Sequence, residues 1–325
     1  MAQKPETGLR YGRSQMELFF NILNADFFSA TIRLATPLLF ATLGGILNER
    51  AGVINIGLEG VMLIGALAGV FGAWFLNSPW LGFACGMIAG GMISWVHGFV
   101  SISLRGNQIV SGAAINLIGI GLTSFLIRIV FGLKEQQRVV PHFDTFSIPG
   151  LADIPLIGPV LFEQQFLVYV ALLLVPVMWF ILYRTHWGLM ITSVGEHPRA
   201  ADSVGINPLR VRYICVFLSG VLAGAGGAFL SLGQLHFFQD EMVAGRGFIA
   251  LAALIFGRWN PVGGLIACLI FGGADALQFR GQAAGLGIPH QFMLMFPYVL
   301  TLGILVVVGG KSQGPAAIGI PYKKA

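Results

Sequence analysis

The sequence is poor in charge. Only 10% of its 325 residues are charged, whereas about a quarter of the residues of a soluble globular chain are charged. Hydrophobic residues make up 56% of the chain. Because so few polar side chains cannot cover the surface of a protein in water, lipid must solvate much of it. The composition excludes an ordinary soluble domain and predicts an integral membrane protein.

Cysteine is also scarce. The three cysteines, Cys85, Cys215 and Cys268, lie far apart in apolar runs, without the spacing of a disulfide framework or a zinc site. We expect them to be buried free thiols. No cluster of cysteine and histidine with metal-ligand spacing is present, so we expect neither a metal nor another cofactor.

Catalytic motifs are missing as well. Residues 309–312 read Gly-Gly-Lys-Ser, like the end of a phosphate-binding loop, but Leu305 stands where that loop requires its first glycine. The chain has no His-Glu-x-x-His and no Gly-x-Ser-x-Gly motif. We therefore expect no site for ATP hydrolysis or covalent chemistry, and a role other than that of an enzyme.

Apolar runs fill most of the chain. Most are about 20 residues long, the length with which an α-helix crosses a hydrocarbon core of ~30 Å. The run 247–257 is too short to cross alone, and is either extended by 240–246 or a re-entrant half-helix. We predict an all-α, polytopic membrane protein with about nine (8–10) transmembrane helices, at 28–47, 53–76, 80–103, 108–132, 165–183, 213–233, 247–257, 261–279 and 291–309.

Hydrophilic stretches organise the chain around these runs. Residues 1–27 form a polar to amphipathic N-terminal segment, and 28–309 the transmembrane domain. The connection 184–212 is net basic, and the tail 310–325 carries lysines. Because positive charge marks the cytoplasmic side, we expect both in the cytoplasm and 133–162 outside. The formal net charge of +5 is interpreted in the same way, as a sign of membrane orientation and not of nucleic-acid binding.

One segment of the 184–212 connection has both helix ends marked. Pro198 suits a first helical turn, and Glu196 favours the positive end of the helix dipole. Gly205 suits a left-handed cap, and Pro208 blocks continuation. These signals predict a short helix over 197–205, which is either a docking element narrow enough for a groove in another protein or an ordinary solvated loop. The residues concerned are Glu196, His197, Pro198, Arg199, Ala200, Ala201 and Gly205.

A second polar segment precedes the run that ends at residue 76. Asn55 and Glu59 are four residues apart, so on a helix they would share one face. A carboxylate within an apolar run is costly and is a candidate functional group. The alternative for Glu59 is a structural hydrogen bond to a neighbouring backbone group or arginine.

Other polar side chains lie at membrane depth. Asn107, Gln108 and Asn116 are candidates for a polar translocation pathway, while Asp275 and most of the others are expected to be structural. Phe237 lies at the outer end of the 213–233 run, where it belongs to an interfacial aromatic belt or stacks on a ring-shaped substrate.

Three blocks of sequence, at 47–62, 244–261 and 316–322, resemble a known family. They read Leu-Asn-Glu-Arg-Ala-Gly-Val-Ile-Asn-Ile-Gly-Leu-Glu-Gly-Val-Met, Ala-Gly-Arg-Gly-Phe-Ile-Ala-Leu-Ala-Ala-Leu-Ile-Phe-Gly-Arg-Trp-Asn-Pro and Ala-Ala-Ile-Gly-Ile-Pro-Tyr. The chain resembles the permeases of the ribose and branched-chain amino-acid class of ABC importers, within their nucleoside and simple-sugar branch. The resemblance extends over nearly all of 28–322.

The resemblance implies a complex in a bacterial or archaeal inner membrane. Its other members would be an ABC ATPase subunit, a second, related permease chain in a heterodimer, and an extracytoplasmic substrate-binding lipoprotein. The segment Glu196–Gly205 matches the coupling helix of the family, which would dock in the ATPase. The implied substrate is a nucleoside, with simple sugars such as pentoses as the alternative.

Two other classes of function compete with this interpretation. An ion-coupled secondary transporter would need carboxylates at membrane depth, and Glu59 and Asp275 would supply them. A membrane enzyme would need a catalytic constellation, and the sequence contains no recognisable one.

Overall fold

Helices account for almost all of the regular structure. The computed structural model describes residues 24–132, 138–147, 149–152, 154, 158–283, 289–308 and 314–323. Within those residues, seven helices are long and apolar enough to cross a membrane. This confirms the predicted all-α, polytopic class. The seven are Ala25–Arg50 (α2), Leu58–Leu76 (α3), Pro79–Ser103 (α4 with a π-helical end), Gln108–Phe131 (α5), Phe166–Arg184 (α6), Pro208–Leu235 (α9 with a π-helical end) and Pro261–Ala283 (α11).

Shorter elements complete the described chain. α10 (Arg246–Phe256) and an apolar stretch of α12 (His290–Val308) fall below the length used for a membrane crossing. α7 (His186–Glu196) and α8 (Pro198–Ser203) lie between α6 and α9. The one short sheet in the described residues pairs β1 (Thr145–Ser147) with β2 (Glu163–Gln165), antiparallel. The predicted number of nine crossings therefore stays a prediction.

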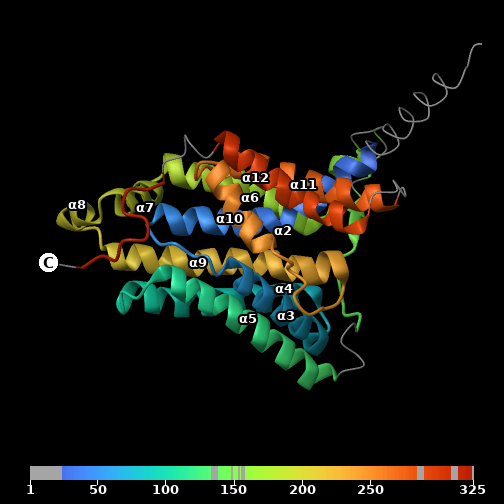
Figure 1. The fold of residues 1–325 in the computed structure, drawn as a ribbon, viewed down its shortest axis with the longest axis horizontal. Coiled ribbons are helices and arrows are strands. Elements are labelled where there is room, and N and C mark those ends of the chain that lie inside the picture. The colour runs from blue at the N-terminus through green and yellow to red at the C-terminus, as the bar shows by residue number, and fades with distance from the viewer. Residues whose placement is uncertain are drawn as a thin grey trace, which may run out of the picture.

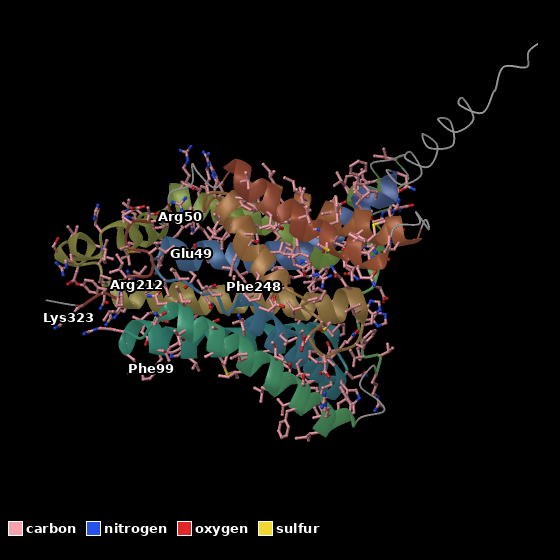
Figure 2. The ribbon with its side chains drawn as sticks, viewed as in Figure 1. Glu49, Arg50, Phe99, Arg212, Phe248 and Lys323 are labelled. Atoms are coloured by element: carbon pink, nitrogen blue, oxygen red, sulfur yellow. The ribbon has the colours of Figure 1, made fainter. Side chains whose placement is uncertain are left out.

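The helices form a layered bundle around α2 and α9, which lie side by side (Figure 1). α3, α4 and α5 pack on one side of this pair, and α6, α11 and α12 lie on the other. α7, α8 and the C-terminus lie together at one end of the long axis, which we call the α8 end. α2 begins at the opposite end and reaches the α8 end at Arg50, as Figure 2 shows.

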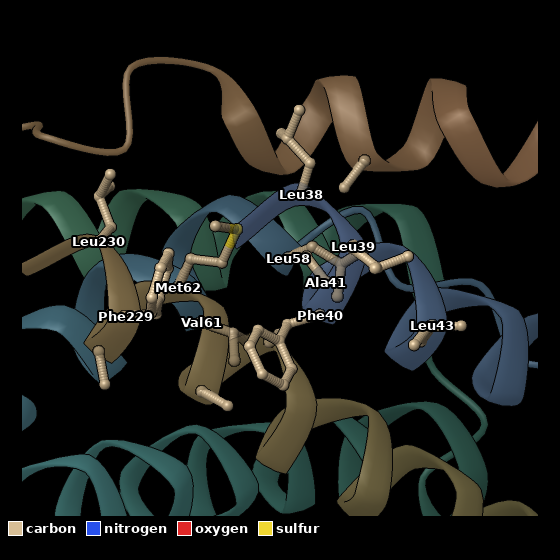
Figure 3. Close-up of a cluster of buried hydrophobic side chains, with 14 of the residues drawn as sticks. Leu38, Leu39, Phe40, Ala41, Leu43, Leu58, Val61, Met62, Phe229 and Leu230 are labelled. Carbon is tan, nitrogen blue, oxygen red and sulfur yellow. The ribbon is translucent and has the colours of Figure 1, made fainter. Parts of the chain in front are cut away.

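Small residues bring three of these helices into backbone contact. A Cβ atom added at Gly65 of α3 would lie 2.6 Å from the Gly224 carbonyl oxygen of α9. One added at Gly86 of α4 would lie 2.7 Å from the carbonyl oxygen of Gly65. Lipid provides no hydrophobic driving force for helices to associate, so close packing of this kind holds them together. Larger apolar side chains fill the adjoining space, including Phe40, Met62 and Phe229 (Figure 3).

One predicted helix start is wrong, and one of two alternatives for a short helix is excluded. α3 begins at Leu58 and not at 53, because residues 51–57 leave the helix. Residues 236–245 are not helical either, so 240–246 do not extend α10. Left-handed backbone at Ala244 (φ 50°) and Gly245 (φ 84°) interrupts the chain just before α10. α10 is therefore a half-helix that begins near the middle of the bundle, where Figure 2 labels Phe248.

Candidate functional site

α8 has the predicted start and stop signals. Pro198 lies in its first turn, and Gly205 has the left-handed φ of +90°. The helix spans Pro198–Ser203, which is shorter than the predicted 197–205. Pro208 does more than block continuation, because it occupies the first turn of α9 behind the capping side chain of Asn207.

The two alanines of α8 face different environments. Ala201 is only 3% exposed and packs into the protein, whereas Ala200 is exposed. Ala201 therefore contacts the protein itself and Ala200 faces outward, while a role of these residues in docking stays a prediction. The apolar side chain of Val204, 75% exposed, projects next to α8. Sequence reasoning missed Val204, although an aliphatic residue between a helix and its glycine cap was a signal.

A C-terminal segment, 314–323, holds α7 and α8 on the bundle. The amide of Ala316 donates to Glu196 Oε2 (3.1 Å), and the amide of Ala317 donates to the Gly195 carbonyl (2.9 Å). The Tyr322 hydroxyl donates to Asp202 Oδ2 (2.9 Å). Because these hydrogen bonds reach both short helices, α8 is attached to the rest of the protein through the C-terminal segment.

The same segment is bonded to the membrane helices. The amide of Gly319 donates to the Gly52 carbonyl (3.1 Å). The buried Arg212 of α9 donates from Nη1 to the Ile320 carbonyl (3.0 Å) and from Nε to the Ala51 carbonyl (3.1 Å). Arg212 and Lys323 lie near the same end of the molecule (Figure 2). The α8 end is thus one hydrogen-bonded assembly of α7, α8, the α2–α3 connection and the C-terminal segment.

Glu49 is a second anchor at this end, and sequence reasoning missed it. Its Oε2 accepts a 2.6 Å hydrogen bond from the buried Trp259 Nε1. The next residue, Arg50, donates from Nε to the Trp259 carbonyl (3.0 Å) and from Nη2 to the Tyr183 hydroxyl (2.7 Å). The end of α2 is therefore joined to the α10–α11 connection and to α6.

The Glu59 carboxylate has partners within the protein. Its oxygens accept hydrogen bonds from the amides of Gly245 (2.8 Å) and Gly247 (2.7 Å), at the start of α10. The first amides of a helix have no partner within it, and they attract negative charge. Glu59 therefore caps the half-helix α10, which is the structural alternative considered for this residue.

Asn55 does not share a helix face with Glu59, so that prediction is wrong. It lies in the non-helical segment before α3, where its Oδ1 accepts from the Gly57 amide (2.9 Å). Backbone that leaves a helix inside a membrane protein must find other partners. α5 supplies two of them: Gln108 Oε1 accepts from the Ile54 amide (2.8 Å), and Asn116 Nδ2 donates to the Ile56 carbonyl (3.1 Å).

The six predicted pathway residues do not gather at one site. Asn55, Gln108 and Asn116 are buried around the 51–57 segment, and Glu59 follows it. Asn107 is exposed and caps α5 by accepting from two backbone amides at 2.9 and 3.2 Å. Phe237 is half-buried beyond the end of α9. Their part in translocation stays a prediction.

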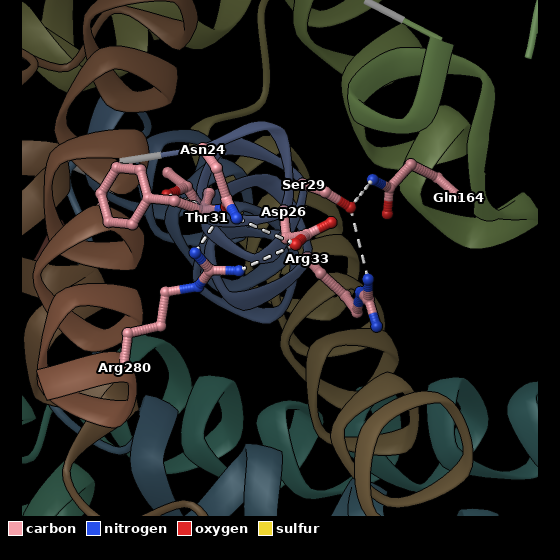
Figure 4. Close-up of polar contacts among 8 residues, drawn as sticks. Asn24, Asp26, Ser29, Thr31, Arg33, Gln164 and Arg280 are labelled. Carbon is pink, nitrogen blue, oxygen red and sulfur yellow. Dashed lines mark hydrogen bonds and ion pairs between the residues drawn. The ribbon is translucent and has the colours of Figure 1, made fainter. Parts of the chain in front are cut away.

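A cavity with both polar and apolar walls opens at the end opposite α8. It has a volume of about 700 Å³, and its walls include Arg33, Gln234, Arg246 and Phe279. Figure 4 shows the neighbouring polar contacts: Arg33 Nη2 donates to Ser29 Oγ (3.3 Å), and Arg280 pairs with Asp26 (3.3 Å). Nothing in the sequence spacing of Arg33 and Arg246 indicated that they line the same cavity.

In the part of the chain that the structure describes, no three His, Cys, Asp or Glu side chains lie close enough together to form a candidate metal site. Cys215 and Cys268 are buried free thiols, while Cys85 is half-buried.

Comparison with known proteins identifies the family. Residues 27–308 match the family described as branched-chain amino acid transport system / permease component. The guanosine ABC transporter permease protein NupQ of Bacillus subtilis (strain 168) is 42% identical, over 91% of this chain and 95% of its own length. The nucleoside ABC transporter permease protein NupC of Lactococcus lactis subsp. cremoris (strain MG1363) is 39% identical, over 90% and 94%.

A third relative carries a different substrate name. TsgC13 of Haloferax volcanii, provisionally named a glucose ABC transporter permease protein, is 40% identical over 86% of this chain and 91% of its own length. No solved structure matches the chain. A match over most of the chain, together with seven apolar helices in the described residues, indicates a multi-pass membrane protein that serves transport. The chain belongs to the family of permease components of branched-chain amino acid transport systems.

Proposed function

We propose that this chain is the membrane-spanning permease subunit of an ABC importer for nucleosides. The observation that carries the proposal is the 42% identity to a guanosine permease over 91% of the chain. The likeness to a nucleoside permease, at 39% identity, supports the same substrate class. A pathway with few charged side chains suits neutral substrates that hydrogen-bond.

The proposal includes partners and a location. An ABC ATPase subunit supplies ATP hydrolysis, because the sequence of this chain contains no phosphate-binding loop. A substrate-binding lipoprotein delivers the nucleoside at the outer face. A second, related permease chain completes a heterodimer in a bacterial or archaeal inner membrane. The exposed apolar face of α5, which includes Leu117 and Phe125, is available to lipid or to that second chain.

In this arrangement the α8 end faces the cytoplasm and α8 is the coupling helix. Its position at the tip of the bundle and the exposed side chains of Ala200 and Val204 support docking in the ATPase. Its hydrogen bonds to the C-terminal segment would pass a movement of the ATPase to α9 and to the α2–α3 connection. The chain then crosses the membrane about nine times within 28–309, between an N-terminal segment, 1–27, and a cytoplasmic tail, 310–325.

A simple sugar is the second candidate substrate. The observation in its favour is the 40% identity to TsgC13, whose name includes glucose. Sugars and nucleosides share a hydroxylated ring, so the fold alone does not separate them.

Uptake by the complete complex tests the proposal. The chain, its partner permease, the ATPase and the binding protein are expressed together, and uptake of radiolabelled nucleosides, pentoses and glucose is compared. We expect ATP-dependent nucleoside uptake that persists when a protonophore removes the proton gradient. Uptake of sugars but not of nucleosides would show that the substrate is a sugar. Uptake driven by an ion gradient without the ATPase would overturn the ABC mechanism.

A further inference from the structure

A second, inner cavity lies among α10, α11 and α12. It has a volume of about 160 Å³ and is lined by Asp275, Gln278 and Tyr298 among others. It shares two wall residues, Arg246 and Phe279, with the 700 Å³ cavity at the end opposite α8. The larger volume is within the range of about 300–1,000 Å³ that is typical of small-molecule sites. The inner cavity therefore forms a mostly apolar recess with a few polar side chains, beside a chamber large enough for a ligand.

Asp275 and Gln278 lie on one face of α11, three residues apart. Asp275 is 9% exposed and Gln278 7% exposed. Within the described part of the chain, neither side chain has a hydrogen bond or an ion pair. Both side chains line the inner cavity, and their polar atoms are accessible from it. Burying a carboxylate and an amide that make no hydrogen bond is costly, and the nearby charge of Arg246 offsets part of that cost for Asp275 alone. Two such groups facing one recess point to a ligand that hydrogen-bonds with both.

Arg246 adds a positive charge to the same recess. Its Nη1 donates to the Met242 carbonyl (3.2 Å), which fixes the guanidinium at the start of α10. Its charge acts on Asp275, although the two side chains form no direct ion pair within the described residues. The recess thus presents an acceptor, Asp275, a donor, Arg246, and the amide of Gln278, which does both. Phe279 adds an aromatic wall that is common to both cavities.

We propose that the inner cavity binds the base of a guanine nucleoside, with its ribose in the outer cavity. This inference rests on the proposed function and names the substrate for it. Guanine carries two adjacent donors, N1–H and the N2 amino group, and a carboxylate accepts both in parallel. The neighbouring O6 is an acceptor, which suits the Gln278 amide or Arg246. A stacking contact with Phe279 completes the recognition.

The chemistry of the recess discriminates against other bases. Adenine presents an acceptor, N1, where guanine presents a donor, so its lone pair would face the Asp275 carboxylate. Inosine keeps N1–H but lacks the amino group, and therefore forms one of the two bonds. A methyl group on N1 of guanosine removes one donor and blocks the approach to the second. Each good bidentate pair with a base discriminates against the wrong base by about tenfold or more.

The first test uses the unmodified protein. The permease pair with its ATPase, without the binding protein, is placed in nanodiscs, and equilibrium binding of tritiated guanosine is measured in competition with unlabelled nucleosides. We expect guanosine to bind most tightly, inosine next, and adenosine and 1-methylguanosine about tenfold or more weaker than guanosine. Equal affinity for guanosine and 1-methylguanosine, or no saturable guanosine binding, would overturn the site.

The second test changes which base the site prefers. Asp275→Asn keeps the shape but replaces one acceptor oxygen by a donor, so we expect weaker guanosine binding and tighter binding of xanthosine, whose C2 carries an oxygen. Asp240→Asn, which alters an acidic side chain bonded to Arg128 outside both cavities, is the matched control. A misfolded variant would lose all ligands and gain none. If Asp275→Asn left the preference for guanosine over xanthosine unchanged, the assignment would be wrong.

Failure of the proposed function has a different signature. If the complete wild-type complex takes up guanosine, but methylation of N1 does not change binding to the permease, the proposed function is supported and the Asp275 site is refuted. If the complete complex takes up no nucleoside at all, the proposed function itself is wrong.

Discussion

The hydroxyl of Tyr322 donates a 2.9 Å hydrogen bond to the carboxylate of Asp202 in α8. The two residues are 120 positions apart in the sequence. With the bonds of Ala317 to Gly195 and of Gly319 to Gly52, this contact makes the C-terminal segment a bridge between α8 and the α2–α3 connection. The orientation of α8 therefore depends on residues at the far end of the chain.

Removing that hydroxyl should loosen α8. In Tyr322→Phe we expect amides of 198–206 to exchange roughly two- to tenfold faster, because a net hydrogen bond contributes about 0.5–1.5 kcal/mol. Hydrogen–deuterium exchange of the purified complex measures the effect. Tyr213→Phe removes a hydroxyl that bonds to Ser103 and serves as the control. Unchanged exchange of α8 in Tyr322→Phe would show that the remaining bonds hold it alone.

The cap of α10 gives a graded prediction. Glu59→Leu removes both acceptors for the amides of Gly245 and Gly247, and Glu59→Gln keeps one acceptor oxygen. Because an unsatisfied buried donor costs about 1–3 kcal/mol, we expect a clearly lower melting temperature for Leu and a smaller decrease for Gln. Thermal unfolding in detergent measures both, with the exposed Glu241→Gln as a control. If Leu and Gln had the same melting temperature as wild type, the capping role would be refuted.

A stacked histidine pair predicts a pH dependence. The rings of His142 and His236 lie 4.0 Å apart at 19°. Burial, and then repulsion from His142, hold the pKa of His236 below its ordinary value of 6.5, although a hydrogen bond to the Gly233 backbone and the charge of Asp144 oppose the shift. Since folded His236 binds a proton less readily than the unfolded chain, its neutral form contributes stability above pH ~6.5 that is lost as the pH falls.

We therefore expect the melting temperature of the wild-type complex to fall between pH 7.5 and pH 5.5. His236→Gln removes the titrating group and should reduce that fall. A fall of the same size in His236→Gln and wild type would assign the pH dependence to other groups.

Composition and run length were enough to predict the class of fold. Charge scarcity and apolar runs of about 20 residues leave few alternatives to a helical membrane protein. Pro198 and Gly205 likewise marked α8, because helix ends depend on local backbone conformation. The start of α3 was missed because residues 53–57 are as apolar as a helix, and only the partners on α5 reveal that their backbone bonds elsewhere.

The site depended on contacts that sequence spacing does not encode. Glu59 meets amides 186 and 188 positions away, so no local pattern could identify its role as a cap. Asp275 was expected to be satisfied by neighbouring helices, and the cavity that it faces forms only when α10, α11 and α12 come together. Ala200 and Ala201 are adjacent in sequence, and the side that α8 presents to the bundle decides which of them is exposed.

Because Ala200 is exposed and Ala201 is buried, substitutions at the two positions distinguish an effect on docking from an effect on folding. Ala200→Trp adds bulk on the exposed side of α8, so we expect normal membrane insertion and thermal stability but loss of ATPase co-purification and of substrate-stimulated ATP hydrolysis. Ala201→Trp forces the same bulk into a site that is 3% exposed, and should instead destabilise the α8 end. Val204→Glu, which charges an exposed apolar side chain, should resemble Ala200→Trp because it disfavours an apolar contact. Co-purification, melting temperature and ATP hydrolysis are measured for each variant. Full ATPase binding and transport by both Ala200→Trp and Val204→Glu would mean that α8 does not dock in the ATPase, and the coupling assignment would be wrong.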